Sequence, residues 1–299
     1  MKTLRIVVQS RMFLVLGVVV AVAVPVFTLP GLPSVSPWPV VLGLLPWVVG
    51  KYVLCPLRWR ALTNADLGRW WHTRAYAESE LLGLLTPGHV GADLWRMRRL
   101  THAGLCRGDA LASVAVDRLV GGVGLTMFVV FAGSSLPLRM LLPALGIGAV
   151  GLVVLLVVHR LRPQLLPTTG PLPPPRRLVH GLVLSMGYQA TIALLLLGTL
   201  GATGHSLSPL QLLGAFGASQ VAAAVPGPNG ASPRDGALVV ALVALGIPWT
   251  AAAAAVSIKA AVAWLPALLL GGASLIITRR LLRHSPAPAP APVPVPVPV

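Results

Sequence analysis

The stretches LTPGHVGAD, residues 85–93, and VPGPNGASPRD, residues 225–235, decide how this chain can fold. Each of them interrupts an apolar segment with Pro-Gly and places an aspartate, Asp93 or Asp235, shortly after the break. Inside a bilayer the backbone polar groups must be satisfied without bulk water, so such a break is tolerated only beside protein or a water-filled cavity. Paired interruptions in the two halves of a membrane chain indicate a transport site.

The composition places the whole chain in a membrane. Hydrophobic residues make up 56% of the 299 residues, charged residues make up 10%, and the mean hydropathy is +0.83. A water-soluble domain of this size carries many more charges. We therefore expect an all-α polytopic membrane protein with about six spanning helices and two re-entrant or short paired hairpins. Apolar runs long enough to span lie at about residues 12–29, 38–55, 110–131, 138–158, 178–200 and 250–277.

The basic residues are distributed as membrane topology requires. The net charge is +16, and 19 of the 23 lysines and arginines fall into five clusters that alternate with loops lacking them. This alternation predicts a multi-pass protein of the plasma (bacterial inner) membrane with both termini in the cytoplasm. The charge then needs no nucleic acid as a partner, and it adds affinity for anionic lipid headgroups. The clusters cover residues 2–11, 51–74, 96–107, 160–177 and 279–283.

The two interrupted segments are expected to be hairpins that open from opposite faces. Segment 76–95 has arginines on both sides, so it should enter and leave at the cytoplasmic face, whereas segment 209–247 follows an uncharged outer loop. Proline removes a donor and glycine accepts conformations that other residues resist, so Pro-Gly can reverse the chain. If the arms of the second segment each cross fully, the remaining topology is unchanged, and both possibilities stay open. The expected structural breaks are Pro87, Gly88, Gly91, Pro226, Gly227 and Gly230.

Equal spacings indicate that the two halves are copies of one unit. Asp117 follows Gly104 by 13 residues, and Lys259 follows Gly246 by the same interval. We expect an inverted repeat about a pseudo-twofold axis in the membrane plane. The expected divisions are a transmembrane domain at 1–283 with halves at about 10–135 and 138–280, and a disordered, proline-rich cytoplasmic tail at 284–299.

Ionisable residues within apolar segments are the candidate functional groups. Such a group costs roughly 2.5–3.5 kcal/mol at the centre of a spanning helix, so it usually faces a partner or a cavity. Asp117 and Arg118 are adjacent and diverge by about 100° on a helix, so each needs its own partner. Our hypothesis pairs Asp117 with Lys259 or Arg234, across the halves. It pairs Arg118 with Asp235. The alternative is a set of ion pairs that hold the halves together and never meet a substrate.

Charged residues around the first break give further candidates. Arg96, Arg98 and Arg99 follow it at the expected inner interface, where phosphate headgroups lie. Arg96 is closest to the break and is the best headgroup ligand of the three, with ordinary positive-inside anchoring as the alternative. Glu78 and Glu80 precede the break and are either a proton or cation site or solvated interfacial carboxylates.

Three motifs occur in a characteristic order. They are Pro-Gly-x-x-Gly-x-Asp-x-x-Arg at 87–96, Asp-Arg at 117–118 and Pro-Gly-x-x-Gly-x-x-x-Arg-Asp at 226–235. In this order they resemble the lysylphosphatidylglycerol synthase transmembrane family, also called flippase-like, over about residues 10–280. The chain departs from the family pattern at Asp235, where a glutamate is usual, and at Asn229, which interrupts a glycine string together with Ser232 and Pro233.

The resemblance implies movement of a lipid between leaflets. Fused members of the family move aminoacylated phosphatidylglycerol made by a cytosolic synthase domain. Here only a proline-rich tail follows residue 283, so the resemblance implies a stand-alone member. Its cargo is then a lipid or polyprenyl-linked anionic headgroup, supplied by a separately encoded lipid-modifying enzyme or glycosyltransferase.

Two other roles stay open at this point. One is a non-catalytic membrane accessory or scaffold for enzymes that modify phospholipids or build lipid-linked glycans, and the other is a membrane-embedded enzyme of glycan assembly. We expect no enzymatic activity, cofactor or metal, because no hydrolase triad, phosphate loop or zinc motif can be assembled. The expected substrate-binding residues are Asp93, Arg96, Asp117, Arg118, Arg234, Asp235 and Lys259.

Overall fold

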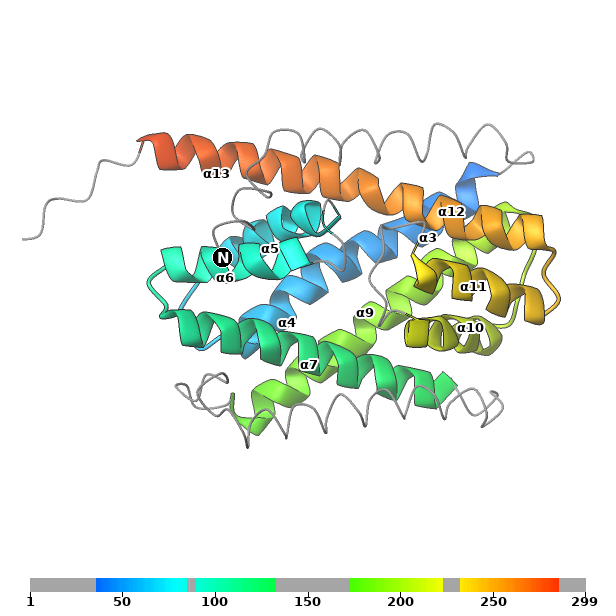
Figure 1. The fold of residues 1–299 in the computed structure, drawn as a ribbon, viewed down its shortest axis with the longest axis horizontal. Helices are drawn as coiled ribbons and strands as arrows, with labels where there is room; N and C mark the ends of the chain where they lie inside the picture. Colours follow the sequence, from blue (N-terminus) through cyan, green and yellow to red (C-terminus); the bar gives the residue numbers. More distant parts are fainter. Residues whose placement is uncertain (1–35, 85, 87–89, 133–172, 223–231, 285–299) are drawn as a thin grey trace, which may run out of the picture.

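The computed structural model is built from helices, and no strand occurs in the part of the chain that it describes (Figure 1). The expected all-α class is confirmed. The described residues are 36–84, 86, 90–132, 173–222 and 232–284. The expected spans at 12–29 and 138–158 lie outside them, as do the expected breaks at Pro87, Gly88, Pro226, Gly227 and Gly230.

The described helices show the same order twice: a long helix, two short helices and a second long helix. Proline lies in the first turn of α3, α9, α10 and α11, where its fixed φ suits the helix and its missing N–H leaves no bond unmade. The first set is α3 (Pro37–Val49), continued through the π-helix η2 (Gly50–Leu54) into α4 (Cys55–Leu62), then α5 (Arg69–Leu84), α6 (Val90–His102) and α7 (Arg107–Ala132). The second set is α9 (Pro175–Ala202), α10 (Pro209–Val221), α11 (Pro233–Ala244) and α12 (Trp249–Pro266), continued through η7 (Ala267–Gly271) into α13 (Gly272–His284).

Among the described residues, four helices are long and apolar enough to cross a membrane. They are Pro37–Leu62, Arg107–Phe128, Pro175–Ala202 and Trp249–Thr278, which match four of the expected spans. The first of them extends beyond the expected end at residue 55. The expected end of this span was therefore wrong: Arg58 and Arg60 lie within the helix, as Lys51 does inside the expected bounds.

The four short helices form two pairs, α5 with α6 and α10 with α11. They contain 12–16 residues and rise about 18–24 Å, less than the roughly 30 Å of a hydrocarbon core. Their lengths favour paired hairpins over two full crossings in each half.

The two sets of helices run in opposite directions. In Figure 1, α3 runs from the end that holds α10 and α11 towards the end that holds α5 and α6, and α9 runs the other way. The α7 helix and the continuous α12–α13 helix are opposed in the same manner. An inverted repeat requires this arrangement, although the repeat itself stays a prediction.

Both hairpins end in the same cap. Gly104 and Gly246 have φ angles of +98° and +93°, a left-handed conformation that favours glycine. In each case the next residue donates to a leucine carbonyl five positions back: Leu105 to Leu100 at 3.2 Å, and Ile247 to Leu242 at 3.2 Å. Gly204 caps the long helix α9 in the same way, with φ +76° and a bond of 3.4 Å from His205 to Leu200, so the shared cap is compatible with the predicted repeat and does not establish it.

Glycines allow α3 and α9 to cross at close range. An added Cβ at Gly43 would lie 2.6 Å from the Leu194 carbonyl oxygen, and one at Gly198 would collide with the Pro39 carbonyl. Helices in lipid gain little from a hydrophobic driving force, so close backbone packing at small residues is what holds them together.

Replacing Gly43 with alanine is expected to lower the free energy of unfolding by about 1–3 kcal/mol, because the new methyl group meets backbone rather than a flexible side chain. Thermal unfolding in detergent micelles measures the change. The matched control is Gly236→Ala on α11, where nothing lies within 4 Å of an added Cβ. Equal unfolding midpoints for the two variants would show that the α3–α9 crossing is looser than described.

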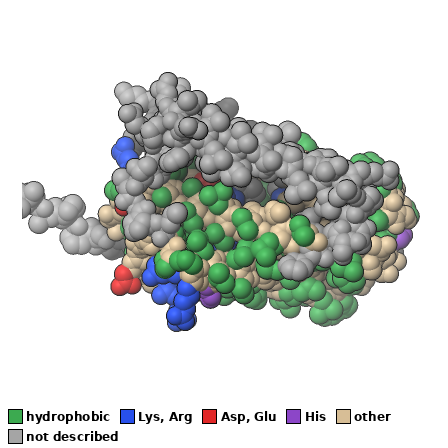
Figure 2. Space-filling view, turned by 90° about the horizontal axis from the view of Figure 1, so that it is seen from below, with side chains coloured by type: hydrophobic (Ala, Val, Ile, Leu, Met, Phe, Trp, Pro, Cys, Tyr) green, Lys and Arg blue, Asp and Glu red, His purple; other side chains and the backbone are tan. Residues whose placement is uncertain are grey.

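The outer surface is suited to lipid. Figure 2 shows hydrophobic side chains spread along one face of the described helices, with lysine and arginine gathered towards one end. Large exposed apolar side chains occur on the long helices, including Leu42, Leu45, Val183 and Leu269. Polar side chains that lie inside this apolar shell therefore need partners or a cavity.

Candidate functional site

A cavity of about 290 Å³ lies between the two sets of helices. Its lining comes from α3, η2, α4, α5 and α7 of the first set and from α9, α10, α11, α12 and η7 of the second. Among the described residues that line it, five are cations and one is a carboxylate, Glu80. The cations are Lys51, Arg58, Arg118, Arg234 and Lys259.

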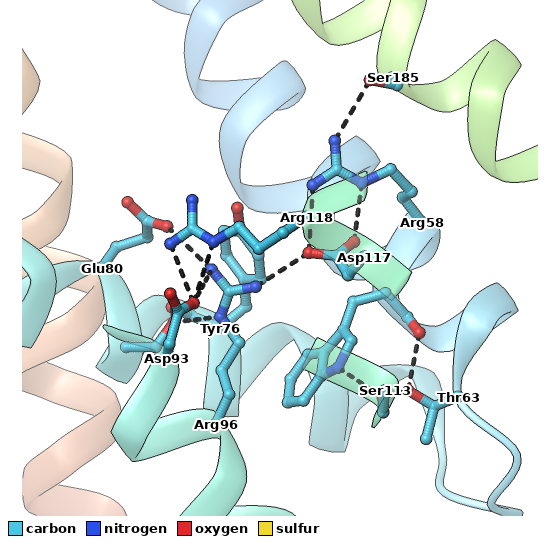
Figure 3. Close-up of polar contacts among 12 residues, drawn as sticks. Arg58, Thr63, Tyr76, Glu80, Asp93, Arg96, Ser113, Asp117, Arg118 and Ser185 are labelled. Atoms are coloured by element: carbon cyan, nitrogen blue, oxygen red, sulfur yellow. Dashed lines mark hydrogen bonds and ion pairs between the residues drawn. The ribbon is translucent and has the colours of Figure 1, made fainter. Parts of the chain in front are cut away.

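Asp117 forms the centre of the buried charge network beside the cavity (Figure 3). Its side chain is fully buried, and it accepts from Arg58 Nε at 2.8 Å, from Arg58 Nη2 at 3.2 Å and from Arg96 Nη1 at 2.9 Å. A further nitrogen of Arg58 donates to Ser185 on α9 at 3.3 Å. One carboxylate on α7 thus joins α4 and α6 to it, and Arg58 reaches across to the second set of helices.

Arg96 is held by its neighbours on every side. It is 1% exposed, its Nε donates to Ser79 at 3.3 Å, and its guanidinium lies 4.6 Å from the Tyr76 ring centroid. Burial alone would lower the pKa of Arg96, but the negative charges of Asp117, Glu80 and Asp93 hold it above its usual value. The expected headgroup ligand is therefore a buried structural cation, and it does not line the cavity.

Arg118 points away from Asp117 and towards α6 (Figure 3). Its Nη2 and Nε lie 2.9 Å and 3.0 Å from Asp93 Oδ1, and its side chain keeps 48% of its surface exposed. The prediction that these two adjacent residues need separate partners is confirmed.

The remaining cations of the cavity are also held by carboxylates, with one exception. Lys51 Nζ lies 2.8 Å from Glu80, and Lys259 Nζ lies 3.2 Å from Asp235. Burial opposes ionisation of Asp235, but the charge of Lys259 and the hydrogen bond from Ser232 keep its pKa below the usual value. Arg234 makes no ion pair within 4 Å of any described carboxylate.

The hypothesis of ion pairs between the halves was wrong. Asp117 bonds Arg58 and Arg96 rather than Lys259 or Arg234, and Arg118 bonds Asp93 rather than Asp235. The physical reason is that α7 packs directly on α4 and α6. The carboxylates of each half therefore form ion pairs with cations of the same half.

The family described as the lysylphosphatidylglycerol synthase TM region matches residues 12–271. The chain belongs to this family. No curated protein and no solved structure matches it.

The family motifs occupy two different places in the structure. Arg118 and Arg234 of the motifs line the cavity, as does Lys259, which lies outside them. Asp93, Asp117 and Asp235 lie behind the cavity and hold cations in position. Gly91, the one expected break that is described, is the second residue of α6 and lies inside the helix, where its N–H donates to Thr86 Oγ1 at 2.8 Å. The carboxylates of the motifs are thus supports for cations rather than the cavity wall.

Glu78 is a buried carboxylate whose hydrogen bonds hold helices together. It is fully buried and accepts from Trp95 Nε1 at 2.9 Å, Ser274 Oγ at 2.9 Å and Thr278 Oγ1 at 2.6 Å. The alternative of a solvated Glu78 is therefore wrong, because these bonds join the first hairpin to α13.

Lys51, Arg58 and the tyrosines of the cavity were missed from the sequence. Lys51 and Arg58 are seven residues apart, a spacing that places both on one face of a continuous helix. That spacing was the available signal, and counting both residues as part of a basic loop concealed it. The tyrosines, Tyr52, Tyr76 and Tyr188, carry no signal of their own in the sequence.

Proposed function

We propose that this protein moves lipids with an anionic headgroup between the leaflets of the cell membrane. The observation that carries the proposal is the cavity between the two sets of helices, lined by five cations and a single carboxylate among the described residues. Membership of the family supports a role in lipid metabolism or transport.

Arg234 is the centre of the proposed headgroup site. A half-buried guanidinium without an ion pair to any described carboxylate is ready to bind phosphate through two parallel N–H···O bonds. Arg118 and Lys259 also line the cavity, and each is paired with one carboxylate, which leaves further N–H donors for a phosphate. These cations would replace the water that an anionic headgroup loses when it leaves the surface of the bilayer.

Alternating access follows if the two sets of helices form an inverted repeat. The opposed directions of α3 and α9 support such a repeat, and the cavity lies where the two units meet. Rocking of one unit against the other around a fixed site would then expose the cavity to each leaflet in turn. The acyl chains remain in lipid throughout.

Translocation makes and breaks no covalent bond, so the proposed role is that of a transporter and not of an enzyme. A separately encoded lipid-modifying enzyme or glycosyltransferase would supply the cargo. The positive-inside pattern supports a cell-membrane location with both termini in the cytoplasm, and it leaves no need for a nucleic-acid partner.

Leaflet exchange in proteoliposomes tests the proposal. Purified protein is reconstituted with phosphatidylglycerol labelled on an acyl chain, and a reductant that cannot cross the membrane quenches the outer leaflet. The proposal predicts that protein-containing vesicles also lose the inner pool, whereas protein-free vesicles keep it. Retention of the inner pool for every anionic lipid tried would instead favour an accessory or scaffold role.

A further inference from the structure

We infer that Glu80 is a proton-binding site and that the protein carries a proton together with each anionic lipid. The inference rests on the proposed function and concerns what drives the movement. The observation that carries it is the ion pair between Lys51 and Glu80, because both members of this pair line the cavity.

The other carboxylates of the network are placed differently. Asp93, Asp117 and Asp235 hold cations from behind the cavity and do not line it. Asp117 is fully buried between two arginines, whose guanidiniums stay protonated in proteins. Glu80 lines the cavity, and the side chains of Glu80 and Lys51 keep 6% and 17% of their surfaces exposed. Among the described carboxylates of the network, Glu80 is therefore the one that a headgroup and a proton can both approach.

Lys51 is the close counter-ion of Glu80. Its Nζ atom lies 2.8 Å from Glu80 Oε2, whereas Arg96 Nη2 lies 3.9 Å from Glu80 Oε1 and the Nη1 atom of Arg96 lies 2.9 Å from Asp117. The charge of Lys51 therefore favours the ionised form of Glu80 until another anion competes for it. The charged and titratable groups around Glu80 are Lys51 and Tyr52 of η2, Tyr76 of α5, Arg96 of α6 and Tyr188 of α9.

The other elements that pack on α5 direct their polar groups elsewhere. The η7 segment has no ionisable residue, and Arg58 of α4 bonds Asp117. The α13 helix meets α5 through Ser274 and Thr278, which donate to Glu78. The state of Glu80 thus depends chiefly on Lys51 and on what enters the cavity.

A phosphate in the cavity changes this balance. It would compete with Glu80 for the ammonium of Lys51, and two negative charges close together in a poorly solvated place repel each other. Protonation of Glu80 removes the repulsion and leaves Lys51, in addition to Arg234, to the phosphate. The proton forms an O–H bond with a carboxylate oxygen of Glu80. It comes from water at the face to which the cavity is open, and it returns to water at the other face as the headgroup leaves.

This coupling determines how the lipid responds to gradients. A phosphodiester carries one negative charge, so a lipid that moves with one proton takes no net charge across the membrane. A pH gradient then draws the lipid to the leaflet on the alkaline side, by about tenfold for each pH unit. A lipid that moves without a proton would follow the membrane voltage instead.

The experiment applies the two gradients separately to vesicles that contain the wild-type protein and a trace of labelled phosphatidylglycerol. The first condition is a gradient of about one pH unit with the voltage held at zero by valinomycin and equal potassium, and the second is a potassium-set voltage at equal pH. We expect about tenfold accumulation on the alkaline side in the first condition and an even distribution in the second. Protein-free vesicles under the same conditions correct for unaided movement.

Variants assign the response to Glu80. Glu80→Gln keeps the shape of the side chain and binds no proton, so the pH-driven accumulation should fall to about twofold or less and the lipid should follow the voltage. Because this change leaves Lys51 without its close counter-ion, the double variant Lys51→Met with Glu80→Gln removes both charges together and should give the same loss. Asp66→Asn, an exposed site between α4 and α5, should keep the wild-type response.

The outcomes separate the inference from the function on which it rests. If the wild-type protein exchanges phosphatidylglycerol but its distribution ignores the pH gradient, movement of anionic lipids stands and the proton site is overturned. Full pH-driven accumulation by both variants would also overturn the assignment to Glu80. If no anionic lipid exchanges under any condition, the proposed function fails and the inference falls with it. Because the first comparison uses the wild-type protein, a variant that folds poorly does not prevent a decision.

Discussion

Replacing Asp117 with asparagine is expected to lower the free energy of unfolding by about 3–5 kcal/mol. The substitution keeps the shape of the side chain and removes the charge that Arg58 and Arg96 share. Both guanidiniums are buried. Without Asp117, Arg58 becomes an uncompensated charge in an apolar surrounding, and Arg96 keeps only the more distant Glu80 and Asp93, each at 3.9 Å. Thermal unfolding of the purified protein in detergent measures the loss.

The control for this variant is Asp66→Asn. Asp66 is exposed between α4 and α5, so removal of its charge is expected to leave the unfolding midpoint nearly unchanged. A midpoint for Asp117→Asn equal to that of Asp66→Asn would contradict the buried network. Such a result would mean that water reaches Arg58 and Arg96 and hydrates them when their counter-ion is removed.

Replacing Arg234 with alanine is expected to slow leaflet exchange of phosphatidylglycerol by about 10- to 100-fold, the range for loss of a hydrogen-bonded charged group. Stability should change little, because Arg234 lies within 4 Å of no described carboxylate and its loss leaves no buried partner. The same exchange assay, run on protein whose unfolding midpoint has been checked, measures the rate.

Two matched variants accompany Arg234→Ala. Arg234→Lys keeps the charge but loses the planar fork, so it should fall between the wild type and the alanine variant. Arg176→Ala removes an exposed arginine at the start of α9 and should exchange at the wild-type rate. Equal slowing by Arg176→Ala and Arg234→Ala would mean that the exchange rate depends on the net charge of the protein and not on the cations of the cavity.

The positions of the described helices could be predicted from the sequence, because the signals that mark a helix are local. Apolar length predicts the long helices, and basic flanks around residues 76–95 predict a hairpin, which the short helices α5 and α6 bear out. Gly104 and Gly246 each end a hairpin in the left-handed conformation that favours glycine, although the sequence alone does not separate them from Gly204, which caps the long helix α9 in the same way.

The partners of the charges could not be predicted in the same way. The sequence shows that Asp117 is buried in an apolar helix, but Arg58 is 59 positions away along the chain and Arg96 is 21. Which of the several arginines reaches Asp117 depends on how α4, α6 and α7 pack. Arg58 was overlooked because the span was expected to end at residue 55, so its seven-residue spacing from Lys51 was not taken as one face of a helix.

The ratio of exchange rates for phosphatidylglycerol and phosphatidylcholine tests the central claim most directly. Both labelled lipids are reconstituted in the same vesicles with wild-type protein or with Arg234→Ala, so differences in reconstitution cancel. A cavity that binds anionic headgroups predicts a ratio well above one for the wild type that falls towards one in the variant. A ratio of one for both proteins would contradict the account, because the lipids would then be crossing without contact with the cationic site.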